Sequence, residues 1–509
     1  MDLRNKIFWI GQAPDTALEE EFKCRDLEIE FFTLITPAPV GGDAIKKISG
    51  ALGVVFVHDP SKLSRTIDFL QAAAAAPTKY SDVRVAIIAE DTLETKRITG
   101  TTAYQSFGDR KYLRVTTLEK TKYRDFVRYF SAPPLPWRAP NFDLTIKSDS
   151  TLTPGQETLL RRSFSEYVSL DLQRIAQQGY SGSVHLAYPQ RVYGMGRGRP
   201  QPFLVKFDEQ DKVERERNFY KEYVITDVPF DLRPNIDEDR CFFSADVGIL
   251  VANYVDRSVS LLQAIEKGGG SNAIHCLFEE SMDRWSRNSW IEKGSPIRSA
   301  SKRFRMDKFV SCPEILIEAR KLGAVPDPDT LISKLESIPC AKYRHGTSHG
   351  DLHVDNVLVK GSSAIIIDFS SCGNGPILID FATLDVTIAF KSIFRCQFKD
   401  NGKFEEWVDF IRQIYAYKNI VALPPAREGF EAFARYWASI RQVRRYALSE
   451  QEDKVEFALC VASELLRHSA FVDDKDIGTK VAAYAYYLSS ELVSEIEKAV
   501  GGKTIEEQR

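Results

Sequence analysis

One short stretch of the chain collects the residue types that phosphoryl transfer uses. It reads HGDLHVDN at positions 349–356 and is followed by an apolar segment, a Gly-Ser-Ser turn and a second apolar segment ending at Asp368. Two short strands joined by a turn would bring Asp351, Asn356 and Asp368 to the same end of a hairpin. Phosphoryl transfer needs one carboxylate that accepts the proton of an attacking hydroxyl, and oxygen ligands that hold Mg²⁺ against phosphates. These residues therefore predict a phosphotransfer site.

The letters and spacing of this stretch resemble those of protein-kinase-like enzymes of the aminoglycoside phosphotransferase and choline kinase type. The motif of that family is HGDxHxxN, followed a short way along the chain by IDF or IDW, and this chain carries IDF ending at position 369. The resemblance implies that Asp351 is the catalytic base and that Asn356 and Asp368 are metal ligands. It also implies that His349 and His353 brace the loop.

A second Ile-Asp-Phe sequence stands at 379–381. Its distance from Asn356 is too long for a tight hairpin and a helical stretch follows it, so we expect Asp380 to begin a helix. In the resembled family such an aspartate commonly braces the catalytic loop by hydrogen bonds. Asp380 is therefore interpreted as a brace and not as a metal ligand.

A glycine-containing segment precedes this site by more than a hundred residues. Residues 177–184 align with the kinase pattern GxGxxGxV, with Gln177 in place of the first glycine. Glycines let backbone amides approach phosphate oxygens closely, and serine hydroxyls add donors. The residues expected to bind the nucleotide here are Gly179, Ser181, Gly182, Ser183 and Val184. Strands are expected on either side, at 172–176 and 184–188.

A lone lysine, Lys206, stands in the apolar segment 203–207. Burying it is costly unless it is paired. On the helix that follows, Glu216 falls on the apolar stripe of 213–220, whereas Glu214 points about 100° away. We therefore predict an ion pair between Lys206 and Glu216, which would steady Lys206 against the nucleotide phosphates. The alternative is a solvated lysine on an edge strand.

The segment after the next pair of strands takes the place of the hinge between kinase lobes. In the resembled family the backbone of this hinge binds adenine, which points to Asn253 and Val255. Residues from about 260 to 345 form a long insertion before the catalytic loop, with a basic cluster between 298 and 308. The cluster is interpreted as a solvated face, with a lid or a cradle for an anionic substrate as the alternative.

The first 130 residues have a different pattern. Strands are expected at 6–10, 27–33, 52–58, 83–89 and 112–115, and helices at 16–22, 44–49, 66–76 and 123–129. Strands that are apolar on both faces and alternate with helices predict an α/β domain with a flavodoxin-like, doubly wound parallel sheet.

This front segment resembles, at low specificity, the receiver domain of response regulators. Asp59 follows the third strand, as the phosphate-accepting aspartate of that family does. However, residues 11–13 carry no acid and Arg114 stands near the position of the family's lysine. A degenerate module that senses a signal or docks a protein partner is therefore favoured over a working phosphoacceptor.

Domain boundaries follow from composition. Residues 131–150 contain Pro133, Pro134, Pro136 and Pro140 and predict a semi-rigid linker. The linker would join the receiver-like domain, residues 1–130, to an α+β, bilobal, protein-kinase-like domain. That domain would consist of a strand-rich N-lobe at 151–255 and a large helical C-lobe at 256–509.

Composition excludes several classes of protein. The 68 Lys and Arg nearly balance the 71 Asp and Glu, giving a net charge of −3, which argues against a nucleic-acid coat or a polybasic membrane tether. Apolar stretches are too short to span a bilayer, and the start lacks the features of a signal peptide. The eight cysteines form no CxxC pair, which is typical of reduced thiols in a cytoplasmic protein.

Together these features predict an ATP- or GTP-dependent, Mg²⁺-dependent O-phosphotransferase that acts on a hydroxyl of a small molecule. Three alternatives remain open: a catalytically weak, nucleotide-binding regulatory pseudokinase, a protein kinase and a nucleotidyltransferase. The acceptor is not identified by the sequence, because the variable helical lobe builds the acceptor pocket in such enzymes.

Overall fold

The computed structural model describes residues 6–25, 27–32, 53–75, 84–105, 113–131, 143–146, 152–164, 167–174, 183–190, 201–243, 247–300, 304, 309, 312–395, 401–422, 431–470 and 477–506. Contacts divide the chain into two compact units. Unit 1 comprises residues 1–217 and 235–254, and unit 2 comprises residues 218–234 and 255–509. Within the described residues, no helix is long and apolar enough to cross a membrane.

The first sheet of unit 1 is built from five parallel strands in the order β2-β1-β3-β4-β5. The strands are β1 (Lys6–Ile10), β2 (Glu28–Phe32), β3 (Gly53–Val57), β4 (Arg84–Ala89) and β5 (Leu113–Thr117). The helices around it are α1 (Thr16–Lys23), η1 (Pro60–Lys62), α3 (Leu63–Ala75), α4 (Thr92–Thr99), α5 (Thr102–Gln105), η3 (Lys120–Lys122) and α6 (Tyr123–Ser131). The expected helix at 44–49 lies outside the described residues.

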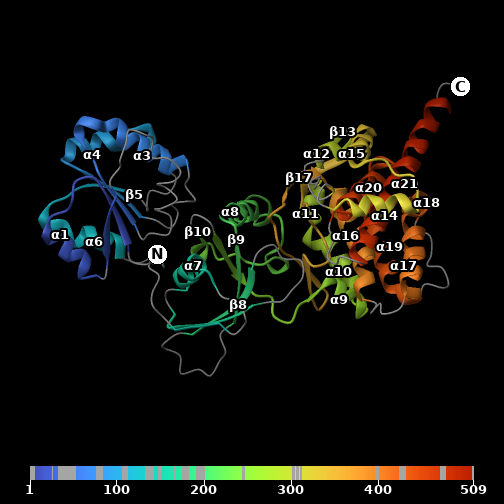
Figure 1. Ribbon diagram of the computed structural model, residues 1–509, viewed down its shortest axis with the longest axis horizontal. Helices are drawn as coiled ribbons and strands as arrows, with labels where there is room; N and C mark the ends of the chain where they lie inside the picture. The colour runs from blue at the N-terminus through green and yellow to red at the C-terminus, as the bar shows by residue number, and fades with distance from the viewer. Residues whose placement is uncertain are drawn as a thin grey trace. The chain divides into compact units, whose positions relative to one another are not determined.

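Helices cover both faces of this sheet (Figure 1). Alternate strand residues point to opposite faces: Phe8 packs with Phe69 of α3, whereas Trp9 packs with Phe22 of α1 and Phe126 of α6. Because both faces are apolar, strand residues such as those of β4 are buried throughout. The five strands lie where the sequence predicts them, but helices α4 and α5 were not predicted.

The second sheet of unit 1 has six strands in the order β10-β11-β9-β8-β7-β6. They are β6 (Asp143–Ile146), β7 (Ser169–Arg174), β8 (Ser183–Gln190), β9 (Phe203–Asp208), β10 (Phe242–Phe243) and β11 (Gly248–Asn253). Helices α7 (Pro154–Ser163), α8 (Gln210–Phe219) and η6 (Glu238–Arg240) accompany them. Neighbouring strands are antiparallel except for the parallel pair β6 and β7.

Strand β6 corrects one expectation. It lies inside the segment 131–150 that was interpreted as a linker, yet it pairs with β7 from Asp143 opposite Ser169 to Ile146 opposite Leu172. Leu144 also packs against the apolar core of this sheet. The four prolines all precede the strand. The rest of the expected linker, 132–142 and 147–150, lies outside the described residues.

The described part of unit 2 contains two three-stranded sheets, in the orders β12-β15-β16 and β13-β14-β17. Their strands are β12 (Val259–Ser260), β13 (Trp290–Gly294), β14 (Cys340–Ser348), β15 (Val357–Lys360), β16 (Ser363–Ile366) and β17 (Gly373–Pro376).

Helices make up most of the rest of unit 2. The first half has η4 (Tyr220–Val224), η5 (Phe230–Leu232), α9 (Leu261–Glu266), α10 (Gly270–Cys276), η7 (Leu277–Ser281), α11 (Asp283–Arg287), α12 (Pro296–Ala300), α14 (Glu314–Leu322) and α15 (Pro328–Ser337). The second half has α16 (Leu378–Arg395), α17 (Asn401–Tyr415), α18 (Tyr417–Ala422), η9 (Glu431–Phe433), α19 (Ala434–Glu450), α20 (Glu456–His468) and α21 (Ile477–Glu506).

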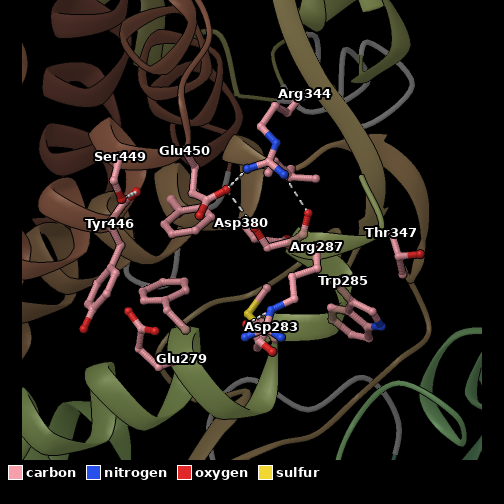
Figure 2. A pocket seen from close by; sticks show the side chains of 15 residues that line it. Glu279, Asp283, Trp285, Arg287, Arg344, Thr347, Asp380, Tyr446, Ser449 and Glu450 are labelled. Carbon is pink, nitrogen blue, oxygen red and sulfur yellow. Dashed lines mark hydrogen bonds and ion pairs between the residues drawn. The ribbon is translucent and has the colours of Figure 1, made fainter. Parts of the chain in front are cut away.

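Helix α16 is the centre of the helical part and packs against α19 and α20. A buried ion pair holds α16 to α19: Arg444 Nε lies 2.6 Å from one Asp385 oxygen and Nη2 lies 3.1 Å from the other. The Tyr415 hydroxyl of α17 donates to Asp385 at 2.9 Å. On the other side, Arg344 of β14 forms an ion pair with Glu450 of α19 and donates to the Ser286 carbonyl at 2.8 Å (Figure 2). These contacts fix the elements that flank the HGDLHVDN segment.

Candidate active site

The HGDLHVDN segment forms the loop between β14 and β15. Gly350 adopts φ +76°, and a Cβ at this position would lie 2.3 Å from the Ser371 carbonyl oxygen. Glycine is therefore required here both for its conformation and for the close approach of the backbone.

Asp380, in the first turn of α16, holds this loop. Its carboxylate is fully buried and accepts hydrogen bonds from the backbone N–H groups of His349, at 2.6 Å, and Gly350, at 2.9 Å. Both acceptor atoms therefore face the loop. The prediction that Asp380 begins a helix and braces the loop is confirmed.

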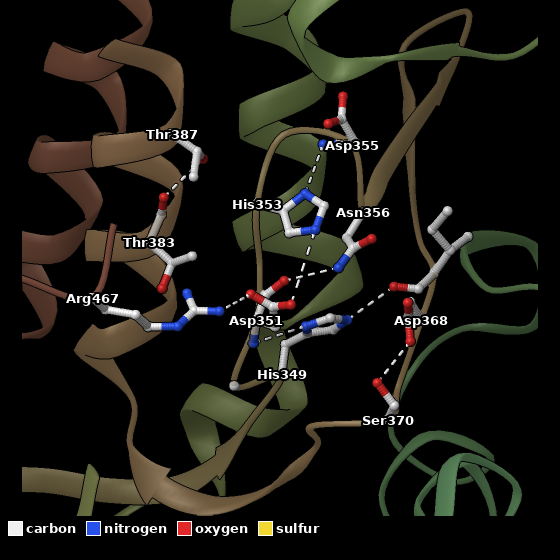
Figure 3. Close-up of polar contacts among 12 residues, drawn as sticks. His349, Asp351, His353, Asp355, Asn356, Asp368, Ser370, Thr383, Thr387 and Arg467 are labelled. Atoms are coloured by element: carbon white, nitrogen blue, oxygen red, sulfur yellow. Dashed lines mark hydrogen bonds and ion pairs between the residues drawn. The ribbon is translucent and has the colours of Figure 1, made fainter. Parts of the chain in front are cut away.

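The hairpin of β15 and β16 places Asn356 and Asp368 at one end. Val357 pairs with Ile366, and the next hydrogen bond, from Ile367 N–H to the Asn356 carbonyl, is 3.0 Å long. Figure 3 shows Asp351, Asn356 and Asp368 gathered around this end of the hairpin. The sequence prediction that these three residues converge agrees with this arrangement.

The side chain of Asn356 is buried and oriented by the loop. Its Nδ2 donates to the Asp351 carbonyl at 2.9 Å, which leaves the amide oxygen to act as a ligand. Asp368 has φ +63°, an uncommon conformation for a residue with a side chain, and accepts a hydrogen bond from Ser370 Oγ at 2.9 Å. One amide oxygen and one carboxylate are hard ligands of the kind that Mg²⁺ prefers. The described residues contain no group of three or more His, Cys, Asp or Glu that would make a metal site.

The two histidines of the motif stabilise the loop. His349 is fully buried, donates from Nε2 to the Ile367 carbonyl at 3.0 Å, and accepts at Nδ1 from the Asp351 N–H at 3.3 Å. The ring centroids of His349 and Phe369 lie 5.6 Å apart, and those of Phe369 and Tyr220 of η4 lie 5.8 Å apart. His353 accepts at Nδ1 from the Asp355 N–H at 3.2 Å.

Burial lowers the pKa of His353, an effect that the nearby Asp351 opposes. A neutral His353 therefore keeps its loop contact at neutral pH.

Arg467 of α20 is a member of the site that the sequence analysis missed. Its Nη2 lies 2.5 Å from an Asp351 carboxylate oxygen (Figure 3). Its Nη1 lies 3.1 Å from Glu464. Burial alone would lower the pKa of Arg467, but Glu464 and Asp351 raise it above its usual value, so the guanidinium remains charged. The sequence contained one local signal, the i,i+3 spacing of Glu464 and Arg467, but nothing that linked Arg467 to Asp351.

A second cation approaches the loop from α16. Lys391 forms an ion pair with Asp355, the residue before Asn356. Next to Arg467, burial lowers the pKa of His468 to about 3, with further contributions from Lys391 and Arg467. The loop is thus held by charged side chains from both α16 and α20.

Lys206 and Glu216 meet in unit 1 as predicted. Lys206 lies on β9 between Val184 of β8 and Leu250 of β11, and its Nζ lies 2.8 Å from Glu216 Oε2 of α8. Both residues are 5% exposed, so the edge-strand alternative is wrong. Whether Lys206 and Glu216 act in catalysis stays a prediction.

The other predicted nucleotide contacts are only partly described. Gly179, Ser181 and Gly182 lie outside the described residues. At the start of β8, Val184 is buried and Ser183 Oγ lies 2.5 Å from His185 Nε2. Burial, with a smaller effect of Arg174, lowers the pKa of His185 to about 4.

The predicted hinge residues make local contacts. The exposed Asn253 accepts a hydrogen bond at Oδ1 from the Asn235 N–H. The Val255 carbonyl accepts one from Ser258 Oγ at 2.8 Å. Their role in adenine binding stays a prediction.

In the first sheet, Asp59 follows β3 and caps η1. It accepts from the Ser61 N–H and Oγ, at 3.0 and 2.6 Å, and lies 3.1 Å from Lys62 Nζ. These contacts, led by the Ser61 hydroxyl, lower the pKa of Asp59 to about 2. Arg114 of β5 instead lies over the ring of Tyr129.

Comparison with known proteins gives distant matches. A family model described as ternary complex associated domain 9 matches residues 322–456. No curated protein matches the chain. Among solved structures, the chain is similar to a glucosamine kinase, with a TM-score of 0.33 and 10% identity over 68% of this chain and 84% of that chain.

Two further similar structures are also small-molecule kinases. One is amicoumacin kinase in complex with AMP-PNP, Ca²⁺ and Ami, with a TM-score of 0.30 and 12% identity over 64% of this chain and 88% of that one. The other is choline kinase from Cryptosporidium parvum Iowa II, with a TM-score of 0.30 and 11% identity over 66% and 91%. Likenesses with TM-scores this low do not decide the chemistry, so the assignment depends on the geometry of the site.

Proposed function

We propose that the chain is an ATP- or GTP-dependent O-phosphotransferase that transfers the γ-phosphoryl group to a hydroxyl of a small molecule. The observation that carries this proposal is the convergence of Asp351, Asn356 and Asp368 at one end of the β15–β16 hairpin, on a loop that Asp380 holds from behind. In an enzyme, the residue that accepts the proton must be held in place, because a small displacement of a catalytic group lowers the rate by a large factor. A protein that only binds a nucleotide does not need a buried side chain such as Asp380 to hold that residue.

Each residue has a defined role in the proposal. Asp351 orients the acceptor hydroxyl and takes up its proton as the bond to phosphorus forms. Asn356 and Asp368 supply hard oxygen ligands for Mg²⁺, which when bound would offset negative charge on the phosphates. Lys206, held by Glu216, binds phosphate oxygens, and the backbone around Ser183 and Val184 contributes to nucleotide binding.

The Asp351→Asn variant tests the proposal. We expect turnover to fall by about 10²–10⁴-fold, the usual contribution of a general base, while the affinity for Mg·ATP stays within a factor of about two. Turnover would be followed by transfer of labelled γ-phosphate to a pool of metabolites. A wild-type protein that binds Mg·ATP but labels no metabolite or protein would refute the phosphotransferase assignment.

One observation favours the regulatory alternative: Arg467 is bonded directly to the carboxylate that should accept the proton. An acceptor hydroxyl would have to share this carboxylate with Arg467. Turnover of the wild type separates the two functions, because a regulator has none. If the wild type turns over, Arg467→Gln tests the contact: turnover should fall because Asp351 is no longer held, while nucleotide binding is unaffected.

Nucleotidyl transfer is distinguished by the label. ATP labelled in both the adenine and the γ-phosphate would deliver adenylate to the acceptor in a nucleotidyltransferase and phosphate in a phosphotransferase. Transfer of adenylate would therefore overturn the proposal.

For the first sheet we propose a receiver-like, partner-binding module. Its strand order is the one shared by flavodoxin-like proteins, and Asp59 stands at the carboxyl end of β3, where ligands of such sheets bind. The contacts of Asp59 with Ser61 and Lys62 favour docking over phosphorylation. Labelling by acetyl phosphate that disappears in Asp59→Asn would show instead that Asp59 is a phosphoacceptor.

A further inference from the structure

A cavity of about 230 Å³ lies within unit 2, apart from the residues proposed for phosphoryl transfer. Its wall comes from η7 and α11, from β14 with the start of α16, and from the end of α19. Asp351, Asn356 and Asp368 are not among its lining residues. In Figure 2, Tyr446 and Glu279 lie on the left of the cavity, and Trp285 and Thr347 lie on the right. Since Glu279 and Ser449 are exposed, the cavity opens to solvent on their side.

Part of the wall is aromatic. The rings of Phe278 and Phe381 are stacked, with centroids 4.2 Å apart and planes inclined by 8°. The ring centroid of Tyr446 lies 5.4 Å from that of Phe278, and the buried Trp285 also lines the cavity. A cavity of about 150 Å³ is enough to hold one benzene ring. This one therefore has room for a ring or similar apolar body with a short charged arm.

The charges of the wall are unequal. Four carboxylates, of Glu279, Asp283, Asp380 and Glu450, stand against the two guanidinium groups of Arg287 and Arg344. Arg287 lies 2.8 Å from Asp283, and Arg344 is paired with Glu450, so the charge of each arginine is offset by a carboxylate of the same wall.

The remaining two carboxylates differ in their surroundings. Asp380 is neutralised in part by the two backbone N–H groups of the loop. Glu279 has no ion pair among the described residues. Glu279 and Tyr446 line the same side of the cavity, and after burial the Glu279 charge is the largest cause that raises the pKa of Tyr446. An unneutralised carboxylate beside aromatic faces is the arrangement that recognises organic cations.

We propose that this cavity is a second ligand site, which binds a small organic cation with an apolar or aromatic body. The ammonium group lies against Glu279 and the aromatic rings, and the body occupies the cavity beside the stacked pair of Phe278 and Phe381. The proposal is independent of the phosphotransferase assignment, because binding to this site is measured without turnover.

The position of the cavity also predicts an effect on the loop. Thr347 of β14 and Asp380 line the cavity, and Asp380 accepts the hydrogen bonds of the His349 and Gly350 N–H groups. A ligand that packs against these residues restricts their motion. Binding should therefore slow hydrogen exchange in the peptide that spans Thr347 to Gly350.

The test uses the full chain and three probes with the same skeleton but different charge. Phenethylamine is the cation, phenylacetate the anion and phenethyl alcohol the neutral compound. Binding is measured by calorimetry and loop protection by hydrogen exchange. Glu279→Gln removes the carboxylate, and Glu280→Gln is the matched control, because Glu280 is the exposed neighbour that does not line the cavity. Ser449→Phe fills the cavity from its exposed rim.

We expect phenethylamine to bind at least about tenfold more tightly than the other two probes. One charge-assisted hydrogen bond between its ammonium group and the Glu279 carboxylate contributes a difference in affinity of this size. Glu279→Gln should remove this preference, Glu280→Gln should retain it, and Ser449→Phe should abolish binding and the slowed exchange. The proposal is overturned if phenethylamine does not bind, if all three probes bind alike, or if Glu279→Gln and Glu280→Gln behave alike.

Discussion

The hydrogen bonds between Asp380 and the HGDLHVDN loop give the most specific prediction. In Asp380→Ala, two buried backbone N–H groups, those of His349 and Gly350, lose their acceptors. Leaving a buried donor unsatisfied costs about 1–3 kcal/mol, so the variant should lose about 2–6 kcal/mol of unfolding free energy. That is a large part of the about 5–15 kcal/mol that stabilises a typical domain. Asp380→Asn should lose less, because its single amide oxygen still accepts one of the two bonds.

Urea unfolding of the full chain, followed by tryptophan fluorescence, measures this loss, and hydrogen exchange of the loop locates it. The control is Asp409→Ala, an exposed acid on α17, which should change stability by less than about 0.5 kcal/mol. In parallel, Asp368→Ala should abolish Mg²⁺-dependent nucleotide binding or turnover while leaving stability nearly intact. The reasoning is refuted by the reverse pattern, in which Asp380→Ala is as stable as Asp409→Ala but loses Mg²⁺ dependence.

Three further variants test other parts of the structure. In Lys206→Met combined with Glu216→Gln, which avoids an unpaired buried carboxylate, steady-state turnover should fall by about 10²-fold or more because phosphate positioning is lost; an unchanged kcat would remove Lys206 from the reaction. Gly350→Ala should abolish turnover and lower the urea midpoint, because its Cβ meets the Ser371 carbonyl; wild-type kinetics would contradict the backbone described. Burial raises the pKa of Glu456 to about 7, so the folded state holds a proton that the unfolded chain releases above about pH 4.5. Relative to Glu456→Gln, the wild type should therefore lose about 2 kcal/mol of unfolding free energy between pH 5 and pH 8; equal pH dependence of the two urea midpoints would show that Glu456 does not titrate in this range.

Local sequence patterns predict the structure correctly where the interacting residues lie close together in the chain. The ion pair of Lys206 and Glu216 follows from one strand and the helix after it, because burial of a lysine demands a partner on the inward stripe. The start of a helix at Asp380 follows from its spacing to Asn356, which is too long for a hairpin, whereas its role as a brace is what the resemblance to the kinase family implies. The strands of the first sheet follow from short runs that are apolar on both faces.

The sequence alone does not predict contacts between residues that are far apart in the chain. Arg467 stands 116 positions after Asp351, and only the packing of α20 against α16 brings its guanidinium to the loop. Strand β6 was missed for a related reason: its four residues acquire their conformation by pairing with β7, 26 positions away, and proline content nearby indicated a linker. The sequence of the last helices offers several Arg and Lys residues that could form an ion pair with Asp351, and it does not indicate that Arg467 is the one that does.

We expect the two-residue turn between β15 and β16 to tolerate inserted residues, which the two strands of the hairpin do not. Because the strand pairing continues to the hydrogen bond between Ile367 and Asn356, extra residues at Gly361 and Ser362 would lengthen the turn and leave the end that carries Asn356 and Asp368 unchanged. One residue added inside either strand would instead turn every later side chain to the opposite face, Asp368 included. Natural variation in length, and any peptide tag inserted by design, should therefore be accommodated at the tip.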